Sequence, residues 1–218
     1  MPYASRTIGA LIDDVNRHYF LPAIQRPYVW SSTQVVALFD SLLKGYPISS
    51  FMFWAIEEET KAELRCYKFI ENYMPDVMNE PTAAEGRQIT LVLDGQQRMT
   101  SLLIGLRGTF SEKAKGARHS NAAAWAAKTL FIDLLKDPDP QNVEEEDSND
   151  LGITYGLAFY ERRPPSNHRH HWFKVGSMLD YSTDDRLEAL VGKVKTEFHP
   201  GVSDWERRVA EETLRRLH

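Results

Sequence analysis

The sequence changes from a strand pattern to a helix pattern at Asp94, and this change constrains the fold more than any other feature. Before it, Gln88–Leu93 is an uncharged run of β-branched and apolar side chains, which is typical of a buried strand. After it, apolar residues recur at helical spacing and predict an amphipathic helix: Met99, Leu102, Leu103 and Leu106. The corner Asp94–Arg98 reads Asp-Gly-Gln-Gln-Arg, so an acid, two amides and a cation gather where a strand passes into a helix.

Two interpretations of this corner are open. Asp94 and Gln97 have the spacing of a capping box, with Gly95 easing the turn, and most such patterns only start a helix. The cap does not explain Arg98, because a cation in the first turn opposes the helix dipole. A guanidinium there suits a bound anion, and the unpaired N–H groups of a helix start also bind anions, most simply phosphate.

Composition and charge narrow the function classes. The chain has 218 residues, 42% hydrophobic and 26% charged, which is typical of a soluble globular protein. Its net charge of −5 argues against a protein that coats nucleic acid, so a DNA contact needs a local basic patch. The single cysteine, Cys66, excludes an intrachain disulfide, and no apolar run is long enough to cross a bilayer. We therefore expect a cytoplasmic protein without membrane contact, with Cys66 as a buried thiol.

A second motif, Gln25-Arg26-Pro27-Tyr28-Val29-Trp30, precedes a predicted helix at Val35–Leu43. Pro27 keeps Arg26 out of helical dihedrals, so the motif is extended and places Tyr28 and Trp30 on one side. Such aromatic residues either pin a loop to the core or stack on the ring of a ligand. We assign Gln25 and Arg26 to a ligand site and Trp30 to the core.

The pattern as a whole predicts an α+β fold in which helices cover one small mixed sheet. Three strands are expected in that sheet, at Phe51–Ile56, Ile89–Leu93 and Leu130–Leu134. We expect a nucleotide-binding core at 1–135 and a linker loop with a more helical extension at 136–218. The chain stops at His218 directly after a helical stripe, which predicts truncation from a longer chain.

The two motifs in this order, with Gly45-Tyr46-Pro47-Ile48 between them, closely resemble the N-terminal domain family of GmrSD-type restriction endonucleases. That family is grouped with the ParB and sulfiredoxin-like folds, so the resemblance implies a core of that type. It is strong from Ile8 to Leu106 and faint afterwards. Members also carry a later Phe-x-Arg-x-Asn-x-x-Gly segment, which this sequence lacks.

The resemblance implies binding and hydrolysis of a nucleoside triphosphate with Mg²⁺, in a prokaryotic system that restricts foreign DNA such as that of phages. It implies that Asp94 orients the metal or a water, that Arg98 clamps phosphate, and that Gln97 acts with them. The nucleotide-binding residues that we expect are Gln25, Arg26, Tyr28, Gly95, Gln96, Thr100 and Ser101. The DNA would be reached through a missing C-terminal nuclease domain or a partner subunit, and the oligomeric state is open.

Other functions remain alternatives to this hypothesis. The basic residues of the two motifs could hold DNA phosphates in a non-enzymatic DNA-binding or modification-sensing module. The ParB-like relationship also allows a nuclease domain. The run His168-Arg169-His170-His171 resembles metal ligands, but adjacent histidines coordinate one ion poorly and no cysteine or carboxylate cluster accompanies them. We interpret this run as a polar loop.

Overall fold

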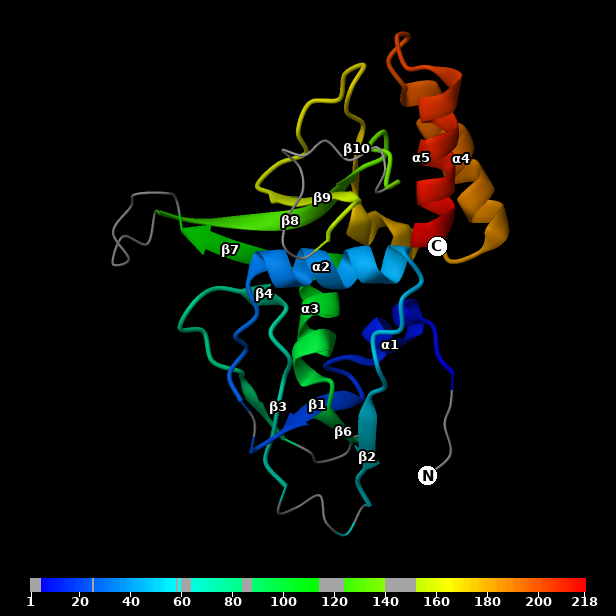
Figure 1. Ribbon diagram of the computed structural model, residues 1–218. Helices are drawn as coiled ribbons and strands as arrows, with labels where there is room; N and C mark the ends of the chain where they lie inside the picture. The colour runs from blue at the N-terminus through cyan, green and yellow to red at the C-terminus, as the bar shows by residue number, and fades with distance from the viewer. Residues whose placement is uncertain are drawn as a thin grey trace.

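The computed structural model describes residues 5–24, 26–57, 59, 64–83, 88–113, 124–139 and 152–218 (Figure 1). Its helices are α1 (Ile8–Asp14), α2 (Ser32–Leu43), α3 (Gln96–Leu106), the 3-10 helix η5 (Val175–Asp180), α4 (Asp184–Glu197) and α5 (Asp204–Leu217). Its strands are β1 (Tyr19–Pro22), β2 (Met52–Ala55), β3 (Cys66–Tyr67), β4 (Asn72–Tyr73), β5 (Pro81–Thr82), β6 (Thr90–Asp94), β7 (Thr109–Lys113), β8 (Trp125–Asp133), β9 (Gly156–Tyr160) and β10 (Trp172–Lys174). The predicted α+β class is confirmed.

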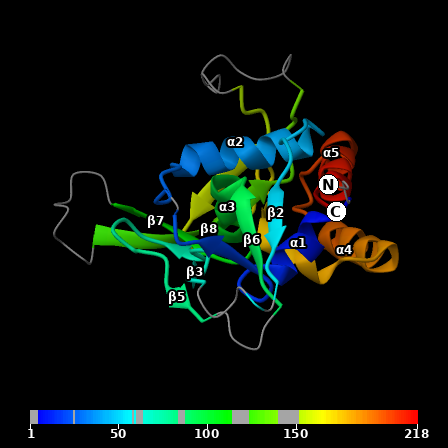
Figure 2. The same ribbon diagram turned by 90° about the horizontal axis from the view of Figure 1, so that it is seen from below.

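Helix α3 runs through the middle of the molecule, and it is the helix that follows the Asp94 corner (Figures 1 and 2). It contacts α1, α2, η5, β7 and β8. All seven residues from 99 to 105 are buried, including the hydroxyl residues Thr100 and Ser101. The predicted helix is thus confirmed, but the exposed polar face expected of an amphipathic helix is wrong for residues 99–105. The hydroxyls can be buried because each donates to the carbonyl one turn back, Thr100 to Gln96 and Ser101 to Gln97.

The first sheet has the order β2-β6-β1-β3-β5, with β1 and β6 parallel and the other pairs antiparallel. One face contributes Val92 to the main core, and the other closes over a small cluster that includes Leu91 and Cys66. Cys66 is a free, buried thiol, as expected. Strand β2 lies at the sheet edge, which leaves Met52 52% and Trp54 50% exposed. The strand predicted at Phe51–Ile56 is thus confirmed as β2, with side chains that are largely exposed because an edge strand has a neighbour on one side only.

The second sheet has the order β10-β8-β7-β4, and β9 also pairs with β8. The strand predicted near Leu130–Leu134 is part of β8, so the single sheet expected from the sequence is wrong. Strand β7 follows α3 directly in the chain. It pairs antiparallel with β8, with partners that run from Phe110↔Lys128 to Lys113↔Trp125. The short run Thr109–Lys113 gave no strand signal, and without it the pairing of β8 could not be predicted.

Helices α4 and α5 pack side by side at one flank of the molecule (Figures 1 and 2). Their buried residues join the same core cluster that begins at Leu11 and ends at Leu214, so residues on both sides of position 135 share one core. The division of the chain at 135/136 stays a prediction. Two i,i+4 ion pairs link successive turns of α5, Arg215–Glu211 at 3.0 Å and Arg216–Glu212 at 2.8 Å. None of the helices that the structure describes has the length and apolar run of a membrane span.

Candidate functional site

The corner is built around Gly95, which stands between the last residue of β6 and the first turn of α3. Gly95 has φ 86°, a left-handed conformation that favours glycine, and a Cβ there would lie 2.4 Å from the Phe51 ring. Gly95 is the N-cap of α3 and provides no side-chain hydrogen bond. The predicted capping box of Asp94 and Gln97 is therefore wrong: Asp94 ends the strand, one residue before the cap.

The start of α3 consequently lacks a side-chain cap. Helices α2 and α5 have complete capping boxes, Ser31 with Gln34 and Ser203 with Glu206. In α3 no side-chain oxygen takes that place, so first-turn N–H groups and the positive end of the helix dipole stay available to an external acceptor. The Asp94 side chain is 70% exposed next to this helix start. The corner thus combines unpaired donors with one accessible carboxylate.

Gln97 joins the two sequence motifs. Its Nε2 donates to the Pro27 carbonyl at 3.0 Å, and its Oε1 accepts the Val29 N–H at 3.1 Å. The Gln97 amide thus bonds both a carbonyl and an N–H of the extended second motif, as the backbone of a neighbouring strand would. Arg26 stands next to this contact, is exposed, and makes no hydrogen bond or ion pair with any residue that the structure describes. Gln25 lies outside the described residues.

Tyr28 anchors the second motif in the protein interior. Its hydroxyl lies 2.8 Å from Ser101 Oγ, and its ring meets Tyr73 edge-on with centroids 5.0 Å apart. Since the single Ser101 hydroxyl proton goes to the Gln97 carbonyl, Tyr28 is the donor in its bond with Ser101. Burial raises the pKa of the Tyr28 phenol, against a smaller opposite effect of the Ser101 hydrogen bond. Tyr28, Thr100 and Ser101 hold the corner together, and their contact with a nucleotide stays a prediction.

Arg98 makes its hydrogen bonds with the protein itself. It donates to the carbonyl oxygens of Ile48 and of Ser50, the latter at 2.9 Å, and its Nη2 lies 3.4 Å from Asp94 Oδ2. The guanidinium sits 5.0 Å from the Phe51 ring centroid, and the side chain is 16% exposed. These acceptors explain a cation in the first turn without any bound anion. Arg98 therefore fixes segment 48–51 against the corner and holds Asp94, a positioning role that the sequence did not reveal.

Gln96 faces the sheet. Its Nε2 donates to the carbonyl of Val92 in β6 at 2.9 Å, four residues earlier in the chain. The structure thus connects Gln96, Gln97 and Arg98 to three different segments, 92, 27–29 and 48–50. The contact of segment 48–50 with the corner was not predicted, although Ile48 belongs to the Gly45-Tyr46-Pro47-Ile48 stretch between the two motifs.

Replacing Tyr28 by phenylalanine tests the link between the two motifs. We expect Tyr28→Phe to lower the free energy of unfolding by about 1 kcal/mol, because one buried hydrogen bond to Ser101 is lost while the ring stays in place. Urea unfolding measures the change, and Tyr160→Phe, on the second sheet, is the control for loss of a phenol. Equal stability of Tyr28→Phe and the wild-type protein would contradict a stabilising role of this bond.

The sequence matches the GmrSD restriction endonuclease, N-terminal domain family over residues 8–188. The chain belongs to this family. The match extends well past Leu106, where the resemblance read from the motifs became faint, and it includes both sheets and the start of α4. Membership of the GmrSD family relates the chain to DNA restriction. No curated protein matches the sequence.

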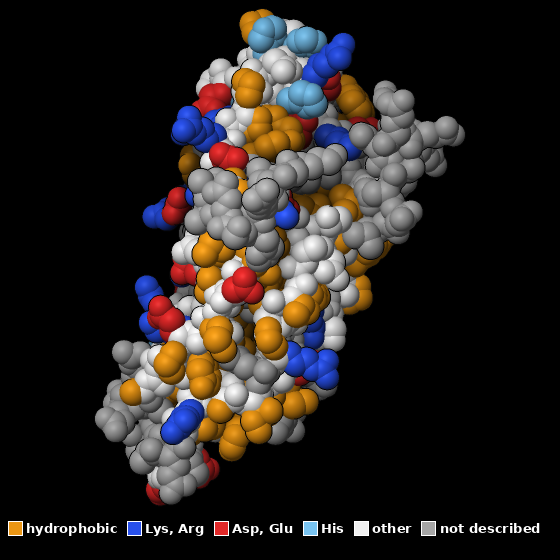
Figure 3. Space-filling model, turned by 90° about the vertical axis from the view of Figure 1, so that its left-hand side faces the viewer, with side chains coloured by type: hydrophobic (Ala, Val, Ile, Leu, Met, Phe, Trp, Pro, Cys, Tyr) orange, Lys and Arg blue, Asp and Glu red, His pale blue; other side chains and the backbone are white. Residues whose placement is uncertain are grey.

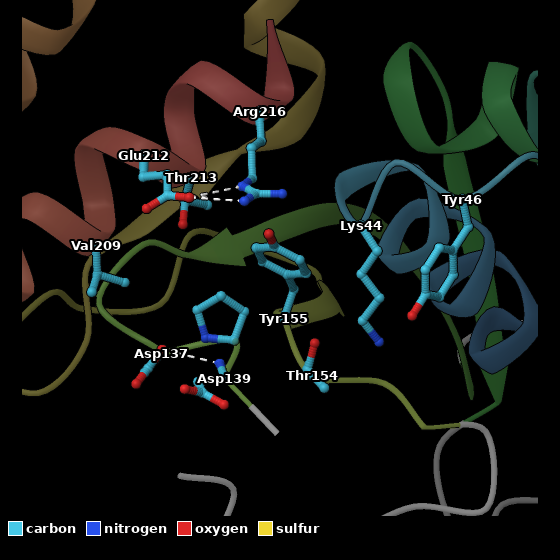
Figure 4. A pocket seen from close by; sticks show the side chains of 11 residues that line it. Lys44, Tyr46, Asp137, Asp139, Thr154, Tyr155, Val209, Glu212, Thr213 and Arg216 are labelled. Carbon is cyan, nitrogen blue, oxygen red and sulfur yellow. Dashed lines mark hydrogen bonds and ion pairs between the residues drawn. The ribbon is translucent and has the colours of Figure 1, made fainter. Parts of the chain in front are cut away.

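A cavity of about 410 Å³ lies away from the GmrSD motif corner, between the end of α2, the start of β9 and α5 (Figure 4). Two cations line it, but both are occupied by protein groups. Lys44 bonds to Asp40 at 2.5 Å and to the Gly152 carbonyl at 2.7 Å. Arg216 bonds to Glu212 and to the Leu43 carbonyl. This cavity therefore offers no unpaired cation to a phosphate, and we place the candidate site at the corner.

Metal ligands are sparse in the described part of the chain. No group of three or more His, Cys, Asp or Glu side chains comes together there as a metal site. In the predicted polar loop, His170 is engaged by protein: its Nδ1 bonds to the buried Asp133 at 2.6 Å. Any metal at the corner would accordingly be held by Asp94 together with groups of a ligand.

Proposed function

We propose that this chain is the nucleotide-binding, NTP-hydrolysing regulatory module of a DNA restriction system that acts in phage defence. The observation that carries the proposal is the uncapped start of α3, which adjoins the exposed carboxylate of Asp94 in a member of the GmrSD family. A helix start with free N–H groups favours phosphate. The exposed Arg26, next to the Gln97 contact, supplies the cation that the inward-bonded Arg98 does not.

The residues present fit Mg²⁺ bound jointly with a nucleotide. Magnesium is commonly held in proteins by one or two carboxylates while phosphate oxygens and waters complete its shell, and Asp94 provides one accessible carboxylate. When bound, Mg²⁺ would neutralise charge on the phosphates. The chain's own residues divide the remaining work: the α3 start binds phosphate, Arg98 orients Asp94, and Gln97 keeps Arg26 beside the helix start.

The test is a hydrolysis assay of the purified protein with each of the four common NTPs, with Mg²⁺ or with EDTA. We expect phosphate release that depends on Mg²⁺ and changes when duplex DNA is added, since a regulatory module couples the two ligands. Nucleotide binding is measured in parallel by calorimetry. If no NTP is bound or hydrolysed under any condition, the proposal is wrong, and a non-enzymatic DNA-binding module becomes the better account.

A further inference from the structure

The loop between β9 and β10, residues 161–171, is a basic surface on an acidic protein. It carries Arg162, Arg163 and Arg169 against a single acid, Glu161, while the whole chain has a net charge of −5. All three arginines are exposed, as are His168 and His170. Figure 3 shows histidine side chains beside Lys or Arg side chains at one end of the molecule, and the loop lies at that end in Figure 1.

The end of this loop is held in place by the buried carboxylate of Asp133. Asp133 is 4% exposed, and its Oδ1 accepts the N–H groups of His171 at 2.9 Å and Leu135 at 3.2 Å. Its Oδ2 bonds to His170 Nδ1 at 2.6 Å. Within the loop, Asn167 Oδ1 accepts the N–H groups of Arg169 and His170. The arginines therefore project from a preorganised backbone, which reduces the entropy lost on binding.

The positive charge of the loop is largely unpaired. Arg162 and Arg169 form no ion pair with any residue in the described ranges, and Arg163 reaches Glu197 only at 3.9 Å. Glu206, near His168, keeps its charge while it accepts from the backbone N–H and hydroxyl of Ser203 at 2.7 and 2.6 Å, and it forms no ion pair with the loop arginines that the structure describes. On the adjoining α4–α5 turn, His199 stands with its ring centroid 6.0 Å from that of His168. The guanidinium groups of Arg162 and Arg169 thus have no ion-pair partner among the described acids.

We propose that the β9–β10 loop contacts the phosphate backbone of duplex DNA, through Arg162 and Arg169 with Arg163 beside them. Guanidinium groups suit phosphate because they offer paired donors in a plane and keep their charge. Membership of a restriction family favours DNA over an acidic protein as the partner. The inference rests on the DNA-restriction part of the proposed function and is independent of nucleotide hydrolysis. Such contacts position the protein without reading base sequence, so unmodified DNA is a sufficient probe.

The experiment measures binding of a fluorescent 30-base-pair duplex to the whole chain at several salt concentrations. We expect Arg162→Ala/Arg169→Ala to weaken binding at least tenfold at low salt. The slope of log affinity against log salt should fall by about two, because each phosphate contact contributes about 0.9. Arg162→Lys/Arg169→Lys should restore most of the affinity, since the charges return. The matched control is Arg17→Ala/Arg65→Ala, which removes two exposed arginines next to β1 and β3.

Several results would overturn this inference: no duplex binding by the wild-type protein, equal losses in the loop and control variants, or no loss in the loop variant. Competition by a poly-glutamate peptide as strong as that by DNA of equal charge would indicate an acidic protein partner instead. NTP hydrolysis without DNA is measured for every variant and should stay at the wild-type rate. A failure of the DNA inference therefore remains distinct from a failure of nucleotide hydrolysis.

Discussion

Replacing Asp94 by asparagine is expected to lower the rate of NTP hydrolysis at least about 100-fold, while the melting temperature stays within about 1 °C of the wild-type value. The side chain is 70% exposed, lies at the end of β6 and does not cap α3, so the fold does not require its charge. The neutral amide loses the charge that would hold Mg²⁺ or polarise a water. Nucleotide binding should survive largely, because the helix start and Arg26 are untouched.

The matched control for this variant is Asp76→Asn. Asp76 is an exposed aspartate in the turn after β4, with φ 68°, a conformation that asparagine also tolerates. It should keep full activity and stability. Hydrolysis, calorimetric binding and thermal melts are compared for both variants. Full activity in folded Asp94→Asn would eliminate the catalytic role of Asp94 and leave a binding module as the better account. Arg98→Ala is a less clear test, since it also releases the carbonyls of segment 48–50.

Replacing Asp40 by alanine is expected to lower the free energy of unfolding by about 3 kcal/mol or more, because it leaves buried partners of a charged group without bonds. Asp40 is 3% exposed on α2, and its Oδ1 accepts the N–H groups of Thr154 and Tyr155, each at 2.9 Å. Its Oδ2 pairs with Lys44 at 2.5 Å, where Lys44 lines the cavity of Figure 4. One carboxylate thus fastens α2 to the start of β9.

Asp40→Asn separates the two functions of this carboxylate. Asparagine keeps an acceptor for the two N–H groups and loses the charge that pairs with Lys44, so its cost should be smaller, about 1–2 kcal/mol. Asp185→Ala, in the exposed first turn of α4, is the control and should cost a few tenths of a kcal/mol at most, through the helix dipole. Urea unfolding gives all three values. A loss below 1 kcal/mol for Asp40→Ala would contradict the anchoring role.

The sequence predicted the ends of individual helices and strands where the signals for them lie within a few residues. Helix α2 begins after Ser31 and ends before Gly45, since a capping box and a glycine with φ 71° lie within a few residues of its ends. The passage from strand to helix at Asp94 was visible in the change of hydrophobic period. In the corner, however, the cap itself was wrong, because an Asp-Gly-Gln-Gln spacing does not reveal which residue turns left-handed.

Only the tertiary structure decided what these elements pack against. The sequence showed that a strand lies near Leu130, but its neighbours are β7, β9 and β10, and pairing depends on contacts between segments distant in sequence. The spacing suggested that Gln97 caps its own helix, yet its side-chain amide forms hydrogen bonds with the backbone of Pro27 and Val29. Arg98 suggested a bound anion, but its partners are backbone carbonyls 48 and 50 positions earlier in the chain. Residues that distant cannot be identified as partners from the local sequence. Short-range spacing thus determines period and helix ends, whereas partners of buried polar groups are fixed only when distant backbone carbonyls and N–H groups come together.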